Sequence, residues 1–103
     1  MTESFHGRTV LIPGGGRGIG YAAGAMMAKQ GAKVVLADVM GDRAIEAAAK
    51  LKDDSGAETL GIACDITDMT AVQKMIAETE TILGPVDIMV NTAAIVSDKT
   101  FLE

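Results

Sequence analysis

A cluster of glycines near the start of the chain is its first candidate for chemistry. Five of the chain's twelve glycines fall in the stretch Pro13-Gly14-Gly15-Gly16-Arg17-Gly18-Ile19-Gly20. Glycines let a phosphate approach backbone N–H groups at the start of a helix, where the helix dipole favours anions and side chains would block the approach. The spacing is G-x-x-x-G-x-G, which is neither G-x-G-x-x-G nor the P-loop pattern G-x-x-x-x-G-K. The alternative interpretation is a tight strand-to-helix turn that binds nothing.

Two aspartates follow at positions that suit a nucleotide site. Asp38 ends the apolar run after the glycine cluster, and Asp65 comes at the end of the next one. A glycine-rich turn with a strand before it, a helix after it and an acid ending the next strand is typical of dinucleotide binding. The residues leave simpler alternatives open: a solvated strand-end acid for Asp38, and a helix-capping acid before Thr67 for Asp65.

Four short apolar runs alternate with three helical patterns, and these elements must position the glycines and the acids. Strands buried on both faces are expected at Thr9–Ile12, Lys33–Asp38, Thr59–Cys64 and Val86–Asn91. The predicted helices are Gly18–Gln30, Asp42–Lys52 and Asp68–Leu83. Gly31 would close the first helix, Thr67 or Asp68 would cap the start of the third, and Gly84-Pro85 would stop it.

Helical spacing also predicts which side chains face the core. The expected core positions are Ile19, Ala22, Ala23 and Met26 in the first helix, Ile45, Ala48 and Leu51 in the second, and Val72, Met75, Ile76 and Leu83 in the third.

The alternation of strands and helices predicts an α/β fold, a Rossmann-like doubly wound parallel sheet with right-handed crossovers. We expect strand order 3-2-1-4, truncated after the fourth strand, in a single partial domain over residues 1–103. In this order two helices cover one sheet face, only the third covers the other, and the fourth strand is an open edge. Such exposed apolar surface is a pairing hazard. We therefore expect a fragment of a longer chain, or one that associates to cover the gap.

Composition narrows the classes of partner. The net charge of −5 disfavours binding to a nucleic-acid backbone. No apolar run is long enough to span a bilayer, and the N-terminus lacks the apolar core of a signal peptide. One cysteine, Cys64, excludes an internal disulfide and suits a reducing compartment, so we expect a cytoplasmic protein. With one histidine and one cysteine in the chain, no metal site is expected.

In four features the sequence resembles the short-chain dehydrogenase/reductase (SDR) family. They are Gly14-Gly15-Gly16-Arg17-Gly18-Ile19-Gly20, Asp38 after the second strand, Cys64-Asp65-Ile66-Thr67, and Asn91-Thr92-Ala93-Ala94 after Asp87-Ile88-Met89-Val90. Together they cover residues from about Gly7 to Ile95. The resemblance implies an oxidoreductase that moves hydride between a secondary alcohol or ketone and a nicotinamide cofactor.

The resemblance also implies which residues would bind that cofactor. The full set is Gly14, Arg17, Gly18, Ile19, Gly20, Asp38, Asp65, Ile66, Asn91, Ala93 and Ala94. Asp38 would accept hydrogen bonds from the adenosine ribose and repel a 2′-phosphate, which favours NAD over NADP. Asp65 would bind the adenine amino group. Ile19 would pack under the nicotinamide end, and Asn91 would flank the cofactor.

The chain also departs from the family pattern. Pro13, Thr92 and Ala94 replace family residues around the glycine loop and the fourth strand. The family's catalytic serine and Tyr-x-x-x-Lys are absent, because the only tyrosine is Tyr21 and Ala25 stands four residues later. We assign no catalytic residue.

Three hypotheses about the function are therefore consistent with the sequence. The first is the cofactor-binding portion of an NAD-dependent enzyme, which as an SDR would be a homo- or hetero-oligomer acting on a small alcohol or ketone. The second is a non-catalytic member (a pseudoenzyme), acting as a partner subunit or an NAD-responsive module. The third, disfavoured by the glycine spacing, is a nucleotide-dependent transferase such as a methyltransferase.

Overall fold

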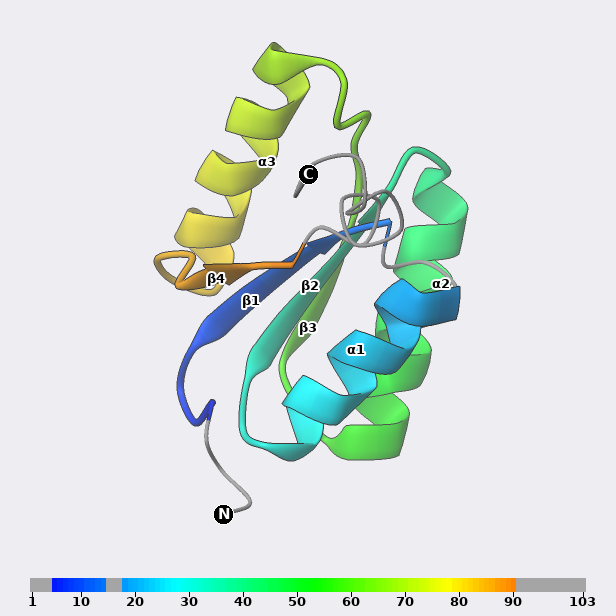
Figure 1. Ribbon diagram of the computed structural model, residues 1–103, viewed down its shortest axis with the longest axis vertical. Helices are drawn as coiled ribbons and strands as arrows, with labels where there is room; N and C mark the ends of the chain where they lie inside the picture. Colours follow the sequence, from blue (N-terminus) through cyan, green and yellow to red (C-terminus); the bar gives the residue numbers. More distant parts are fainter. Residues whose placement is uncertain (1–4, 15–17, 91–103) are drawn as a thin grey trace, which may run out of the picture.

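The computed structural model describes residues 5–14 and 18–90. Three helices alternate with four strands in this part of the chain (Figure 1). In chain order they are β1 (Thr9–Pro13), α1 (Gly18–Lys29), β2 (Lys33–Asp38), α2 (Gly41–Ser55), β3 (Thr59–Ala63), α3 (Met69–Ile82) and β4 (Ile88–Met89). The predicted alternation is confirmed, and β2 has the predicted bounds.

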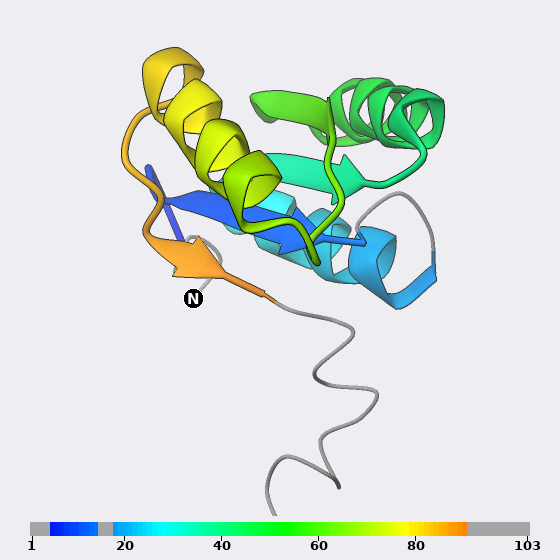
Figure 2. The ribbon, with the colours of Figure 1, turned by 90° about the horizontal axis from the view of Figure 1, so that it is seen from above.

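The four strands form one parallel sheet in the order β3-β2-β1-β4, as predicted. Figure 2 shows α1 and α2 packed against one face of this sheet and α3 against the other. Two buried clusters result, one on each face. Val10, Ile12, Val34 and Leu36 point toward α1 and α2, whereas Leu11, Val35 and Ala37 point toward α3.

Burial on both faces holds only for the two inner strands. Every residue of β1 is buried, and so is all of β2 except Lys33. In β3 only Ile62 is buried, and Met89 of β4 is 47% exposed. The prediction of burial on both faces is therefore wrong for β3 and β4, which are the two edge strands of the sheet. The exposure of Met89 agrees with the expectation that the fourth strand is an open edge.

The core faces of α1 and α2 also differ from prediction. Met26 and Ile45 are each 57% exposed, although both were expected in the core. Small residues face the sheet instead: Gly20, Gly24 and Ala28 in α1, and Ala44 and Ala48 in α2. They let the helices lie close to the strands, and a Cβ at Gly24 would come within 3.2 Å of Leu36 Cδ2. In α3 the expected Met75 is buried, as is Thr79.

The helix ends follow local chemistry. Asp68 is the N-cap of α3, and its carboxylate accepts hydrogen bonds from the N–H groups of Thr70 and Ala71, which satisfies two donors with no partner inside the helix. Gly31 follows α1 with φ of 93°, as expected of a C-terminal glycine. The helix α2 runs past the predicted Lys52 to Ser55, where Gly56 ends it in a left-handed conformation.

The strand β4 is shorter than predicted, and Pro13 accounts for its end. Thr9 and Leu11 accept hydrogen bonds through their carbonyls from Asp87 and Val90, both at 2.9 Å. In a parallel ladder the next bond would run from the N–H of residue 13 to the carbonyl of Val90. Proline has no N–H to donate. The β1–β4 pairing therefore stops after Met89.

Candidate functional site

The glycine turn lies at the carboxyl end of β1, where the sequence analysis placed it. Gly14 has φ of 76° and Gly18 has φ of 59°, a region that L side chains rarely adopt. The Gly14 N–H donates a 2.6 Å hydrogen bond to the Ala37 carbonyl, which ties the turn to the end of β2. A Cβ at Gly18 would meet nothing within 4 Å. The turn thus leads into α1 with open space beside its first residue.

Asp38 closes β2 and is only 7% exposed. This burial excludes the alternative of a solvated strand-end acid. Its Oδ1 accepts a 2.9 Å hydrogen bond from the N–H of Met40. Among the described residues nothing donates to Oδ2. One oxygen thus fixes the loop into α2, and the other keeps its accepting capacity for a ligand hydroxyl.

Asp65 follows the end of β3 and is exposed. Its Oδ1 accepts hydrogen bonds from the Thr67 hydroxyl at 2.6 Å and from the Thr67 N–H at 2.9 Å. These two bonds hold the pKa of the Asp65 carboxyl below its usual range. The helix cap is Asp68, so Asp65 does not cap α3.

A backbone bond brings the two acidic strand ends together. The N–H of Cys64 donates to the carbonyl of Asp38 at 2.9 Å. The loop after β2 also passes close to β3, because a Cβ at Gly41 would lie 2.8 Å from the Cβ of Ala63. Gly14, Asp38 and Asp65 therefore share the carboxyl edge of the sheet, where ligands of open α/β sheets bind.

Exposed apolar side chains follow each of the two acids in the chain. We call them the apolar rim: Val39, Met40, Ile66 and Met69, which are between 41% and 69% exposed. Only Ile66 was predicted as a site residue. Val39, Met40 and Met69 could have been found from their positions, because large apolar residues stand there shortly after a strand-end acid or at the start of a helix. Such a rim suits the faces of a flat apolar ring.

Several predicted site residues cannot be placed. Arg17, Asn91, Ala93 and Ala94 lie outside the described residues, and so does the side chain of Ile19. Gly20 is buried in the first turn of α1. The site roles of these residues remain predictions.

The region between α1 and α2 carries a second feature, which the sequence analysis missed. The Lys50 ammonium lies over the ring of Tyr21, 5.5 Å from its centroid. Burial and then the nearby Asp54 carboxylate raise the pKa of Tyr21. The Tyr21 hydroxyl is shielded from solvent, and it forms no hydrogen bond with any residue that the structure describes. Tyr21 thus packs between the two helices.

Other side chains of the described part offer little chemistry. Cys64 is buried, and burial followed by the charges of Asp65 and Asp68 raises the pKa of its thiol, which makes it a poor nucleophile. Within residues 5–14 and 18–90, no three His, Cys, Asp or Glu side chains gather as a metal site. No helix of those residues has the length and apolar character to cross a bilayer.

Comparison with known proteins identifies the family. The short chain dehydrogenase family model matches residues 8–103. An uncharacterized oxidoreductase of Thermotoga maritima is 34% identical over 97 residues, and a sorbitol dehydrogenase of Cereibacter sphaeroides is 37% identical over 89 residues. These alignments cover 94% and 86% of this chain but only 38% and 33% of the two relatives. The chain thus spans well under half the length of these curated relatives.

Solved structures agree with this result. A citronellol catabolism dehydrogenase of Pseudomonas aeruginosa matches with a TM-score of 0.82 and 31% identity, over 88% of this chain and 38% of that one. An L-sorbose reductase of Gluconobacter frateurii, solved with NADPH and L-sorbose, matches with a TM-score of 0.80 and 32% identity, over 86% and 34% of the two chains. Fold, site and comparisons together show that this chain belongs to the short-chain dehydrogenase/reductase family, whose members bind nicotinamide cofactors.

Proposed function

We propose that this chain is the NAD-binding portion of an SDR oxidoreductase that moves hydride between a secondary alcohol or ketone and the nicotinamide ring. The observation that carries the proposal is Asp38. It is 7% exposed at the end of β2, with one carboxylate oxygen bonded to the Met40 N–H. A buried acid held at this position suits the ribose hydroxyls of a dinucleotide.

The other site residues would complete the binding of the cofactor. The turn from Gly14 to Gly18 would leave backbone N–H groups at the start of α1 for the pyrophosphate. The apolar rim would hold the adenine ring, and the free oxygen of Asp65 would accept from its amino group. The cofactor supplies the hydride chemistry, and these residues bind and orient it.

NAD is the preferred cofactor in this proposal. A carboxylate at Asp38 attracts the ribose hydroxyls of NAD but repels the 2′-phosphate of NADP. The L-sorbose reductase structure contains NADPH, so the preference of this chain rests on Asp38 and not on that neighbour.

The substrate class and the setting are also proposals. The relatives include a sorbitol dehydrogenase and an L-rhamnose 1-dehydrogenase, which fits a small alcohol or ketone. We propose a homo- or hetero-oligomer that works in the cytoplasm. The single cysteine supports that compartment, and the exposed edge residue Met89 supports association.

Calorimetric titration of the protein as isolated from its source tests the cofactor proposal. We expect saturable NAD binding that is tighter than NADP binding. Asp38→Asn keeps an acceptor for the Met40 N–H but removes the charge, so NAD should bind about tenfold more weakly. The affinity for NADP should fall by a smaller factor. Asp53→Asn, at an exposed position near the end of α2, is the matched control. Absence of binding by either cofactor would favour a non-catalytic family member.

A further inference from the structure

The strand β3 lies at one end of the sheet, and no strand of the described part of the chain pairs with its outer edge. Figure 2 shows α3 on one side of this edge and α2 on the other. Toward β2, the Glu58 carbonyl and the Cys64 N–H both form hydrogen bonds. Residues that bond to one neighbour alternate along a parallel strand. The backbone N–H and carbonyl groups that point outward are therefore those of Thr59, Gly61 and Ala63.

The sequence of β3 contains none of the usual protections of an exposed edge, which are charged residues, proline and bulges. The strand Thr59–Ala63 has no charged residue and no proline, and its register with β2 is continuous. This edge is therefore open to pairing with a further strand.

A cavity of about 270 Å³ lies beside the edge, between β3 and α3. Sites for whole small molecules have volumes of about 300–1,000 Å³, so this smaller cavity suits a single side chain. Its lining includes Ile62 of β3 and Met75 of α3, which are both buried. An apolar side chain is the kind that fits between them.

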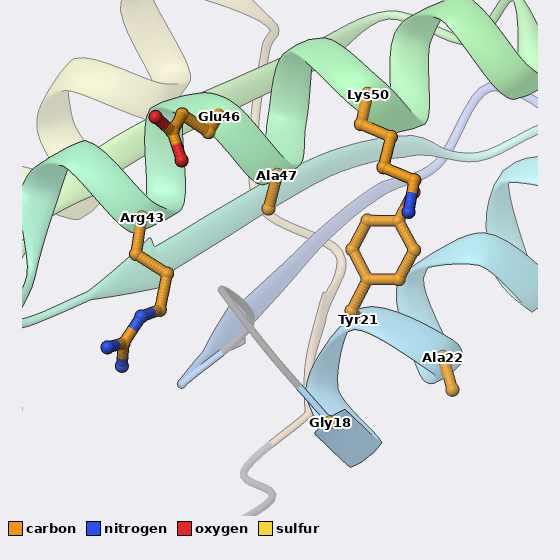
Figure 3. A pocket seen from close by; sticks show the side chains of 7 residues that line it. All are labelled: Gly18, Tyr21, Ala22, Arg43, Glu46, Ala47 and Lys50. Carbon is orange, nitrogen blue, oxygen red and sulfur yellow. The ribbon is translucent and has the colours of Figure 1, made fainter.

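Ile45 marks the other side of the same edge. Its side chain is 57% exposed, and its Cα would lie 2.7 Å from a Cβ at Gly61. One flank of α2 faces α1 across the α1–α2 cavity (Figure 3), which is lined on the α2 side by Arg43, Glu46, Ala47 and Lys50. With 3.6 residues per turn, Ile45 lies on the opposite flank, over the middle of the β3 edge.

We propose that the β3 edge is an interface between two copies of this chain, in which β3 pairs antiparallel with itself about a two-fold axis at Gly61. In this register Gly61 faces Gly61, and Thr59 of each copy faces Ala63 of the other. Each of these is a hydrogen-bonded pair, which exchanges two N–H···O bonds, so every outward-facing group of β3 finds a partner. A two-fold interface requires such self-complementarity.

The side chains around the edge are also self-complementary. In this register Leu60 of one copy pairs with Ile62 of the other, on the α3 face and beside the apolar cavity. Because Ile45 lies over Gly61, the axis brings the two Ile45 side chains together. Asp42 precedes Ile45 and Lys52 follows it, so the axis sets the acidic end of one α2 beside the basic end of the other.

The position of α2 leaves room for this arrangement. Leu51 packs with Leu36 of β2, and the Ala44 carbonyl lies over Gly61 of β3, so α2 covers the groove between the two strands. Paired strands are about 4.8 Å apart, so α2 and its copy would be about 10 Å apart, close to the packing distance of two helices. The inference gives the proposed homo-oligomer a specific interface, and it uses no residue assigned to the cofactor.

Sedimentation of the whole protein tests the interface through charge. Ile45→Glu and Ile45→Lys each place two like charges at the axis, so each should weaken the association at least about tenfold and halve the mass of the dilute protein. An equal mixture of the two variants should restore the wild-type mass, because opposite charges then meet. Glu46→Lys, at the next residue but on the α1 flank, should leave the mass unchanged.

Oxidative cross-linking provides a second test, which detects this interface even if the protein also associates through other surfaces. Ile45→Cys in a Cys64→Ala background should form a disulfide between two copies and double the mass on a non-reducing gel, because the axis brings the two Cα atoms within disulfide range. Glu46→Cys in the same background should stay a single chain.

The outcomes separate this inference from the proposed function. An unchanged mass for both charged variants, a mixture that stays dissociated, or equal cross-linking at positions 45 and 46 overturns the interface. NAD binding that is normal in Ile45→Glu is expected, because the cofactor residues lie elsewhere. Absence of NAD binding by the wild type overturns the cofactor proposal and leaves the interface standing if the charge mixture restores the mass.

Discussion

The backbone N–H of Cys64 donates a hydrogen bond of 2.9 Å to the carbonyl oxygen of Asp38. This bond extends the β2–β3 pairing one residue beyond the last residue of β3, so the two strands end level. The side chains of Asp38 and Asp65 leave the sheet at the same edge for this reason. The bond from Gly14 to Ala37 fixes the glycine turn in the same way. Backbone hydrogen bonds between neighbouring strands therefore bring Gly14, Asp38 and Asp65 to one edge of the sheet.

Substitution of Gly61 should destabilise the protein. A Cβ there would lie 2.5 Å from the carbonyl oxygen of Ala44 and 2.7 Å from Ile45 Cα, both backbone atoms that cannot turn aside. Gly61→Ala would push α2 away from β3 and should cost about 1–3 kcal/mol of unfolding free energy. Urea unfolding measures this loss. Ala63→Ser, exposed in the same strand, should stay within about 0.5 kcal/mol, and equal stability of the two variants would contradict the contact.

Thr67 should control the titration of Asp65. Its two hydrogen bonds favour the charged carboxylate and lower the Asp65 pKa. The resulting stabilisation is present above the unfolded-state pKa, about 3.9, and is lost as the pH falls through the lower folded-state value. Thr67→Val removes the hydroxyl donor, so the Asp65 pKa should rise toward its usual range and this loss should begin at higher pH.

Carboxyl-carbon NMR titration measures that shift directly. Thr81→Val is the matched control, because the Thr81 hydroxyl donates to Ala77 in α3 and not to a carboxylate. An Asp65 pKa that is the same in the wild type and in Thr67→Val would show that the backbone bond alone lowers it.

The sequence predicted the sheet well because buried parallel strands carry a strong apolar signal. The bounds of β2, the strand order and the position of Asp38 at the end of β2 were all predicted correctly. An acid at the end of a strand is located correctly as soon as the strand itself is predicted correctly.

The buried faces of the helices were harder to predict, because they depend on the size of the side chains and on how closely each helix approaches the sheet. Ile45 was expected in the core for its hydrophobicity, but Ala44 faces β3 where Gly61 admits close contact. The pairing of Tyr21 with Lys50 and the position of Arg43 depend on how α1 and α2 pack, which no local pattern in the chain encodes. The α1–α2 cavity was missed for the same reason.

Replacement of Pro13 should lengthen the β1–β4 ladder. Pro13→Val supplies an N–H that faces the Val90 carbonyl, the next position after the bond from Val90 to Leu11. The added bond stabilises by about 0.5–1.5 kcal/mol, whereas loss of proline costs about 0.4–1 kcal/mol through the unfolded state. The net stability should change little. Amide exchange is the better measurement, and the new N–H at position 13 should be protected like that of Leu11, whereas rapid exchange would contradict this account of why β4 ends.

The Cys64 thiol should react slowly with alkylating reagents. Burial raises its pKa, and the negative charges of Asp65 and Asp68 raise it further. Reaction requires the thiolate, so iodoacetamide at pH 8 should modify the native protein at least about tenfold more slowly than the urea-unfolded protein. Asp68→Asn keeps a good N-cap while removing one charge, so it should shift the pH–rate profile to lower pH without unfolding α3. Asp53→Asn, distant in the chain, should leave the profile unchanged, and a wild-type rate that is already maximal at pH 7 would contradict the raised pKa.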